Sequence, residues 1–284
     1  MHKPRLLALI LGTGLVAAPQ FSRAELLLYY SFDNFGVGPA TNNAVIDNII
    51  AGKPDGTLRF GTSGGAVNFV AGGTVAGGNL GRSLQLTPAA DGNQNLEAPN
   101  IDTAFTAIQL SITPSSAYTA MAWVNFASQA GDNMIFGQNG TVAAGGRVLH
   151  HGSRNGNYHS GHWNDDLGPD QGVSIATGAG IWHHVAYTNE PSGTQSIFVD
   201  GVQVATGGSN GTAGEMDTIQ NILIGTSNNA GSFSGMLDEI KIYNETLTAA
   251  QIQAASNVIP EPASCALIAL GAGAVALLGR RRRA

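Results

Sequence analysis

From residue 25 to residue 257 the sequence is a succession of short apolar segments separated by clusters of glycine and asparagine, such as Ala71-Gly72-Gly73. Glycine supplies 39 of the 284 residues, about twice its usual share. Charged residues make up 11% of the chain, too few for a coiled coil, and hydrophobic residues make up 43%, too many for a disordered chain. The pattern predicts a domain of many short strands, which is typical of a β-sandwich.

Several of the apolar segments have the length and the residue types of strands. They are Leu26–Phe32, Thr119–Phe126, Met134–Gly137, Trp182–Asn189, Gln195–Val199, Val202–Thr206, Ile222–Gly225 and Phe233–Tyr243. Asp200-Gly201 separates two of them and predicts a tight hairpin turn. After the last segment, Thr248 and Gln251 have the spacing of a capping box and Ile252 supplies an apolar contact, so we expect one short helix there.

The first 24 residues have the three parts of a secretory signal peptide. Lys3 and Arg5 give a positive start, Leu6–Ala18 is apolar, and Ser22-Arg23-Ala24 offers small residues to a signal peptidase. We expect cleavage before Glu25 and export across the inner membrane. The alternative, an uncleaved anchor, is disfavoured because the apolar segment is short for a membrane span.

The last 28 residues, 257–284, form a tripartite tail. A Pro-Glu-Pro triplet precedes the uncharged stretch 263–279, which as a helix covers about 25 Å, and an arginine cluster follows. The arginines would hold that end of a transmembrane segment on the cytoplasmic side. A plain membrane anchor is the alternative. The residues that carry the signal are Pro260, Glu261, Pro262, Arg280, Arg281, Arg282 and Arg283.

This tail resembles the PEP-CTERM sorting signal of Gram-negative bacteria. The resemblance implies transient anchoring in the inner membrane, recognition and removal of the tail by an exosortase, and delivery to the cell surface or to an exopolysaccharide matrix.

Charge and cysteine content narrow the partners of the central region. Residues 25–257 contain six basic and eighteen acidic residues, and the resulting negative field repels nucleic acid. Divalent cations and neutral glycans remain as partners. The single cysteine, Cys265, cannot form an internal disulfide.

Several segments, taken in order, carry a family resemblance. They are Leu28–Asp33, Trp182–Ala186, Ile197–Gly201, Ile222–Gly225, Gly235–Tyr243 and Leu247–Ile252. Together they resemble a laminin-G-like domain of the concanavalin A-like jelly-roll class, over about residues 25–256. The resemblance implies two antiparallel sheets packed face to face, usually as a non-catalytic recognition module.

Alternation along the last strand predicts that Asp238 lies in the core-facing row with Met236 and Ile240. A buried carboxylate needs a hydrogen bond, an ion pair or a metal ion. Related folds commonly hold a structural Ca²⁺, and Asp33, at the end of the first strand, is a second candidate ligand. The alternative is hydrogen bonding of Asp238 to backbone amides.

A second cluster combines histidine, aromatic and acidic residues. Residues 147–151 and 158–163 are expected to pair as a hairpin, and the hypothesis is a glycan platform in which a ring stacks on a sugar. Its residues are Tyr158, His162, Trp163 and Asp165. The alternative is that Trp163 packs in the core. A zinc site is not favoured, because the histidines lack a recognised metal-ligand spacing.

The sequence lacks an enzyme's constellation of residues, so we predict that the protein is not an enzyme. Asp238-Glu239 and Asp165-Asp166 are adjacent pairs, which diverge on a strand. Glu215-Met216-Asp217 has the spacing of a jelly-roll glycosidase dyad, but Gln220 stands where those enzymes place a third acid.

The leading hypothesis is an exported, surface- or matrix-sorted β-sandwich that binds carbohydrate or exopolysaccharide. The first alternative is a structural or adhesive matrix protein without a small ligand. The second is a polysaccharide lyase or glycoside hydrolase. Which glycan is bound, and in which oligomeric state, the sequence does not say.

Overall fold

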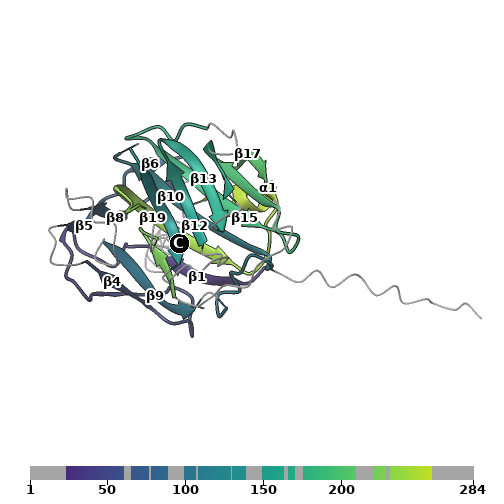
Figure 1. Cartoon of the computed structure of the whole chain (residues 1–284). Helices are drawn as coiled ribbons and strands as arrows, with labels where there is room; N and C mark the ends of the chain where they lie inside the picture. Colours follow the sequence, from purple (N-terminus) through teal and green to yellow (C-terminus); the bar gives the residue numbers. More distant parts are fainter. Residues whose placement is uncertain are drawn as a thin grey trace, which may run out of the picture.

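The computed structural model describes residues 24–60, 65–76, 78–88, 99–106, 108–128, 130–138, 149–162, 166–169, 175–208, 221–227 and 231–257. These residues form two large antiparallel sheets packed face to face and one short helix, as expected from the sequence (Figure 1). Residues 1–23 of the signal peptide, residues 258–284 of the sorting tail and residues 215–220 lie outside the described part. Within that part, no helix is both long enough and apolar enough to cross a membrane.

Sheet A has the strand order β17-β16-β15-β10-β19-β8-β5-β2, and β1 also pairs with β19. Its strands are β1 (Leu26–Tyr30), β2 (Gly38–Pro39), β5 (Ala66–Ala71), β8 (Arg82–Thr87), β10 (Tyr118–Phe126), β15 (Trp182–Asn189), β16 (Gln195–Val199), β17 (Val202–Gly207) and β19 (Gly235–Tyr243). The predicted turn at Asp200-Gly201 joins β16 to β17, with both residues at positive φ.

Sheet B has the order β14-β13-β12-β11-β18-β9-β4-β3. Its strands are β3 (Val45–Ile46), β4 (Gly56–Arg59), β9 (Asn100–Thr106), β11 (Asp132–Gln138), β12 (Leu149–Arg154), β13 (Asn157–His162), β14 (Asp166–Leu167) and β18 (Asn221–Ile224). A separate small hairpin pairs β6 (Thr74–Val75) with β7 (Gly78–Asn79). All the predicted strand segments occur, whereas β4, β5, β8 and β9 were not predicted.

The central strand of sheet A is β10, which is buried along its whole length. Ala120, Val124 and Phe126 point into the main core between the sheets. Met121 and Trp123 point to the outer face of sheet A. The apolar residues on both faces of this segment are therefore explained by a strand that is covered on both sides.

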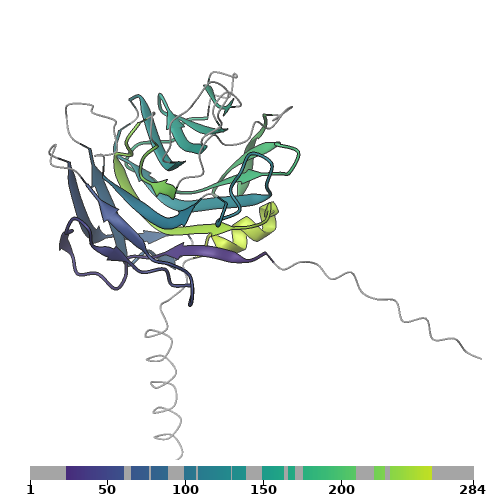
Figure 2. The same cartoon turned by 60° about the horizontal axis from the view of Figure 1, so that its bottom comes forward.

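Helix α1 (Ala249–Ala255) covers part of that outer face. The capping box is present: Thr248 accepts from the Gln251 backbone, and the Gln251 side chain accepts from the Thr248 backbone. Ile252 is fully buried with Met121 and Phe198 in a second, smaller core. Figure 2 shows α1 lying against the long strands of sheet A, so this sheet is covered on both faces where the helix sits.

One prediction about the last strand is wrong. A β-bulge at Glu239, which has a φ of +50°, interrupts the alternation along β19. Asp238 pairs with Trp123 and lies on the outer face of sheet A, whereas Leu237 and Ile240 pack in the core. The core-facing row therefore contains Leu237 in place of Asp238, because the extra residue of a bulge reverses the faces that follow it.

The hairpin predicted around residues 153–156 is present and joins β12 to β13. Its two turn residues, Asn155 and Gly156, have φ of +48° and +75°, as a tight hairpin turn requires. His151 and Ser160 face the core, while His150 and His159 lie on the outer face of sheet B. This hairpin thus carries histidines to both sides of one sheet.

Candidate functional site

Asp33 and Asp238 are brought to the same end of β8. The Asp33 Oδ1 atom accepts a hydrogen bond from the backbone N–H of Arg82 at 2.7 Å. Asp238 Oδ2 accepts from Ser83 Oγ at 2.8 Å, and Asp238 Oδ1 accepts from the backbone N–H of Glu239 at 2.7 Å. Asp238 is fully buried. Its bond from the Glu239 backbone is of the kind expected if backbone amides, and no Ca²⁺, stabilise the carboxylate.

The surroundings of these carboxylates also suit an oxygen-binding cation. Burial raises the pKa of Asp238 well above its usual range, and the charges of Glu239 and Asp33 raise it further. Gly72 and Gly81 leave room for the two carboxylates, because a Cβ at Gly81 would overlap Asp33 Oδ1 and one at Gly72 would lie 3.3 Å from Asp238 Oδ2. A donor set of carboxylate and hydroxyl oxygens fits Ca²⁺.

The residues of the expected glycan platform lie in different places. Tyr158 is 1% exposed and its ring packs edge-on against Phe126, with ring centroids 6.2 Å apart. His162 is fully buried, and its Nε2 lies 2.8 Å from the hydroxyl of Tyr118. Neither ring therefore offers a face to a ligand. Trp163 and Asp165 lie outside the described residues, and their role stays a prediction.

Two cavities lie on the outer face of sheet A, one at each end of α1. The Thr248 groove has a volume of ≈ 460 Å³. It is lined by Thr188, Glu190, Pro191, Ser196, Phe198, Gln203, Thr246, Leu247, Thr248 and Ala249. Ligand pockets usually measure about 300–1,000 Å³, so this groove is large enough for a sugar.

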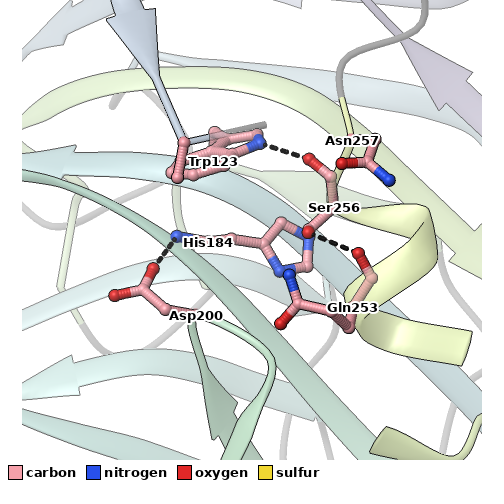
Figure 3. A pocket seen from close by; sticks show the side chains of 7 residues that line it. Trp123, His184, Asp200, Gln253, Ser256 and Asn257 are labelled. Atoms are coloured by element: carbon pink, nitrogen blue, oxygen red, sulfur yellow. Dashed lines mark hydrogen bonds between the residues drawn. The ribbon is translucent and has the colours of Figure 1, made fainter. Parts of the chain in front are cut away.

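The second cavity, the Trp123 recess, is smaller at ≈ 80 Å³. It is lined by Ala76, Trp123, His184, Asp200, Gln253, Ser256 and Asn257 (Figure 3). The indole Nε1 of Trp123 donates to the carbonyl of Ser256 at 2.9 Å, which fixes the end of α1 against the sheet. A cavity of this volume holds several water molecules or one polar group of a larger ligand.

His184 is the unusual group of the Trp123 recess. Burial, with a smaller contribution from the charge of Lys241, lowers the pKa of His184 to about 3, and Asp200 opposes the shift only in part. Its Nδ1 has no hydrogen-bond partner among the described residues. Its place at a cavity was not predicted, because the helix that closes the recess comes 65 residues or more later in the chain.

Comparison with known families gives two matches. Residues 91–253, more than half of the chain, match the model of the concanavalin A-like lectin/glucanases superfamily. Residues 258–283 match the PEP-CTERM protein-sorting motif. Such signals mark exported proteins that are sorted to the cell surface in Gram-negative bacteria, and they imply processing by an exosortase. No curated protein matches the sequence.

Several solved structures have a similar fold at low sequence identity. Domain 4 of AbnA, an extracellular arabinanase from Geobacillus stearothermophilus solved with arabinotriose, is 19% identical, with a TM-score of 0.55; the match covers 82% of this chain and 98% of that chain. The binding domain of Paraclostridial Mosquitocidal Protein 1 is 13% identical, with a TM-score of 0.51 and coverage of 81% and 51%. Trypanosoma rangeli sialidase is 17% identical, with a TM-score of 0.47 and coverage of 80% and 32%.

Proposed function

The chain belongs to the concanavalin A-like lectin/glucanases superfamily, and from this premise we propose that it is an exported, surface- or matrix-sorted module that binds carbohydrate without cleaving it. The observation that carries the proposal is the Thr248 groove on the outer face of sheet A. The likeness to an arabinanase domain solved with arabinotriose supports it, since nearly the whole of that domain is matched.

The lining of the groove has the mixed chemistry that sugars need. The Glu190 carboxylate, the Gln203 amide and the hydroxyls of neighbouring threonine and serine residues are suited to sugar hydroxyls. Pro191 and Phe198 supply apolar surface for the C–H face of a ring. Polar groups placed around an apolar floor are the usual composition of a small-molecule site.

The acids of the described residues support binding rather than hydrolysis. Glycoside hydrolysis commonly uses two carboxyl groups that face one cleft. Among the described residues that line the groove, Glu190 is the only acid. Glu239 is 2% exposed and is paired with Lys241 at 2.9 Å, so it does not face an open cleft.

The test is a binding assay of the full chain against arabinotriose and a panel of neutral polysaccharides. The double variant Glu190→Gln/Gln203→Ala is expected to weaken binding at least tenfold, because hydrogen bonds to a sugar are lost. Val202→Ala is the matched control, because Val202 neighbours Gln203 on β17 but is 64% exposed and lies outside the groove.

Other outcomes of this assay contradict the proposal. Self-association of the chain with no carbohydrate binding would favour a structural or adhesive matrix protein. Shortening of the polysaccharides would favour a lyase or hydrolase. Binding that the double variant leaves unchanged would place the sugar outside the groove.

The two end segments direct the export and the sorting of this module. We propose that signal peptidase removes residues 1–24, that the tail holds the chain briefly in the inner membrane, and that an exosortase releases it to the surface or to an exopolysaccharide matrix. Mass spectrometry of the surface protein is expected to lack both segments. A surface protein that retains residues 263–279 would instead indicate a permanent anchor.

We also propose a structural Ca²⁺ at Asp33 and Asp238, with the oxygen donors described above as its support. EDTA is expected to lower the melting temperature, and added Ca²⁺ is expected to restore it in the native chain but not in Asp238→Asn. An unchanged melting curve would indicate that Asp238 accepts hydrogen bonds and binds no Ca²⁺.

A further inference from the structure

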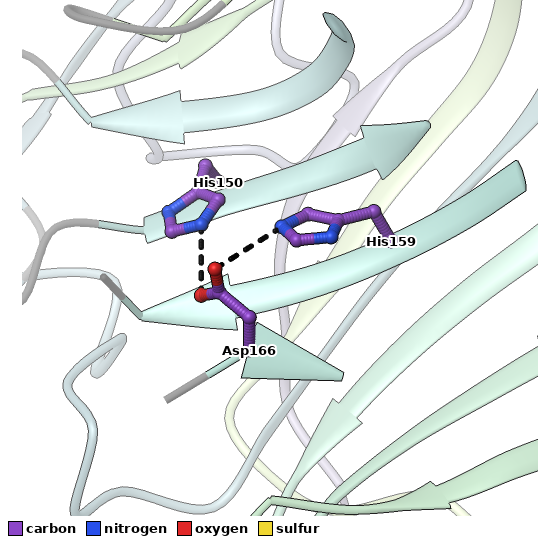
Figure 4. Close-up of side chains that lie close together, drawn as sticks. All are labelled: His150, His159 and Asp166. Atoms are coloured by element: carbon purple, nitrogen blue, oxygen red, sulfur yellow. Dashed lines mark ion pairs between the residues drawn. The ribbon is translucent and has the colours of Figure 1, made fainter. Parts of the chain in front are cut away.

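Three adjacent strands at the edge of sheet B bring two histidines and one aspartate together on its outer face (Figure 4). His150 comes from β12, His159 from β13 and Asp166 from β14. The His150 Nε2 atom lies 3.0 Å from Asp166 Oδ1, and the His159 Nε2 atom lies 3.8 Å from Asp166 Oδ2. One ligand atom from each residue falls within 4.8 Å of the other two.

Two glycines let these side chains approach one another. His150 and Asp166 are both cross-strand partners of Gly161, which separates them in the sheet. A Cβ at Gly161 would overlap Asp166 Oδ1 and lie 2.5 Å from His150 Nε2. A Cβ at Gly168 would overlap His159 Nδ1. The absence of a side chain at Gly161 therefore lets the ligand atoms of His150 and Asp166 meet across this strand.

We propose that His150, His159 and Asp166 bind one divalent transition-metal ion, for which Zn²⁺ is the natural probe. Tetrahedral Zn²⁺ with bonds of about 2.0–2.2 Å holds its ligand atoms about 3.3 Å apart. One ligand atom from each of the three residues already lies within 4.8 Å of the other two, so rotation of the side chains can bring them to that spacing. Imidazole nitrogens select Zn²⁺ and its neighbours over Ca²⁺ or Mg²⁺, which take oxygen ligands. Three protein ligands leave the fourth position for water.

The charges around the cluster agree with a bound cation. Although burial opposes it, the hydrogen bond from His150, with the charges of the histidines and of Arg154, lowers the pKa of Asp166, so its carboxylate is ionised. Arg154 lies 3.7 Å from Asp166 Oδ2 but is itself fixed by Asp132, at 2.8 Å. Asp166 therefore keeps its charge and is only partly neutralised by the arginine.

An ion in this position would link β12, β13 and β14, the last three strands at one edge of sheet B. The chain has one cysteine and therefore no internal disulfide to do so. Metal binding to the folded state alone raises stability in proportion to the logarithm of the metal concentration. The ion thus acts as a cross-link of the sheet edge.

The experiment titrates Zn²⁺ into the full chain after EDTA treatment and dialysis, by calorimetry and by thermal melting. We expect one equivalent to bind, and the melting temperature to rise by roughly 5–10 °C at free Zn²⁺ about 100-fold above Kd. Co²⁺ is expected to give the visible absorption bands of a four-coordinate site. No binding, or a Co²⁺ spectrum of the hexa-aqua ion, would overturn the proposal.

Variants assign the ion to this cluster. Asp166→Asn and Gly161→Ala are expected to abolish the Zn²⁺ response, the second because its methyl group would overlap Asp166 Oδ1 and lie 2.5 Å from His150 Nε2, which forces these two ligand atoms apart. His183→Asn is the matched control, since His183 pairs with Asp200 at 2.8 Å away from the cluster. Circular dichroism checks that each variant is folded. A Zn²⁺ response that survives in both folded variants, or that is lost in the control, would contradict the assignment.

Discussion

The hairpin of β12 and β13 carries histidines on both faces, and the two faces are built differently. On the inner face, the Nε2 atoms of His151 and His162 lie 2.7 and 2.8 Å from the hydroxyl of Tyr118. On the outer face, His150 and His159 stack with ring centroids 5.1 Å apart beside a carboxylate. The inner histidines thus share a neutral hydroxyl within the core, whereas the outer histidines lie beside a charged carboxylate.

Hydrogen bonds join the polar groups of the inner face into one network. His151 Nδ1 lies 3.3 Å from the backbone nitrogen of Gly161 and 3.1 Å from Ser160 Oγ, and its Nε2 lies 2.7 Å from the Tyr118 hydroxyl. The Tyr118 hydroxyl carries one proton, so at least one of its two histidine contacts is donated by a ring N–H. A second proton on His151 would face the N–H of Gly161. Burial first, and then the neighbouring histidines, hold the pKa of His151 well below its usual range.

The largest expected effect is that of Tyr118→Phe on the inner face. The variant removes the hydroxyl that joins His151 to His162 and leaves two buried ring nitrogens without that partner. We expect a loss of about 2–4 kcal/mol in the free energy of unfolding, measured by denaturant titration of the full chain.

Tyr187→Phe is the matched control for that variant. The Tyr187 hydroxyl is also buried but makes a single bond, to the Gly152 carbonyl at 2.8 Å. Its loss is expected to cost about 1 kcal/mol. Equal costs for the two variants would show that the paired histidines do not depend on Tyr118.

The second prediction concerns the stability of the fold at acidic pH. Because the pKa of His151 is depressed in the fold, the unfolded chain takes up a proton below about pH 6.5 that the folded chain does not. The stability that His151 contributes is therefore lost as the pH falls below about 6.5. Relative to His151→Gln, the native chain is expected to lose stability at a rate that rises toward about 1.4 kcal/mol per pH unit as the pH falls from 6.5 to 5.

The comparison with His151→Gln separates the pH dependence due to His151 from that of the other buried titratable groups. Burial raises the pKa values of Asp238 and Glu239, so these groups act in the opposite direction, but they are common to both proteins. A difference in stability that stays constant with pH would mean that His151 titrates normally.

The sequence was sufficient where one local signal decides the structure. Asp200-Gly201, the hairpin around residues 153–156 and the capping box of Thr248 each depend on residues that are adjacent or one turn apart, and all three are present. The bulge at Glu239 could not be predicted, because a non-glycine residue at positive φ has no sequence signature there.

The metal ligands were missed for a different reason. The expected zinc patterns have fixed spacings within one loop or helix, whereas His150, His159 and Asp166 meet only through the register of three strands. Gly161, which leaves the space for them, is one of many glycines in the sequence. The histidine-rich hairpin was recognised as a candidate site. Which of its residues can bind a ligand, however, depends on how they divide between the two faces of the sheet.

The smallest expected effect is that of Asp166→Asn in the metal-free chain. The Asp166 side chain is 16% exposed, and Arg154 keeps its pairing with Asp132 in the variant, so we expect a loss of about 1 kcal/mol or less at pH 7 by denaturant titration. Because the pKa of Asp166 is lowered in the fold, this contribution is present above about pH 4 and lost as the pH falls through the folded value. A cost as large as that of Tyr118→Phe would show that the outer cluster stabilises the fold without metal, and the contrast between the two faces would disappear.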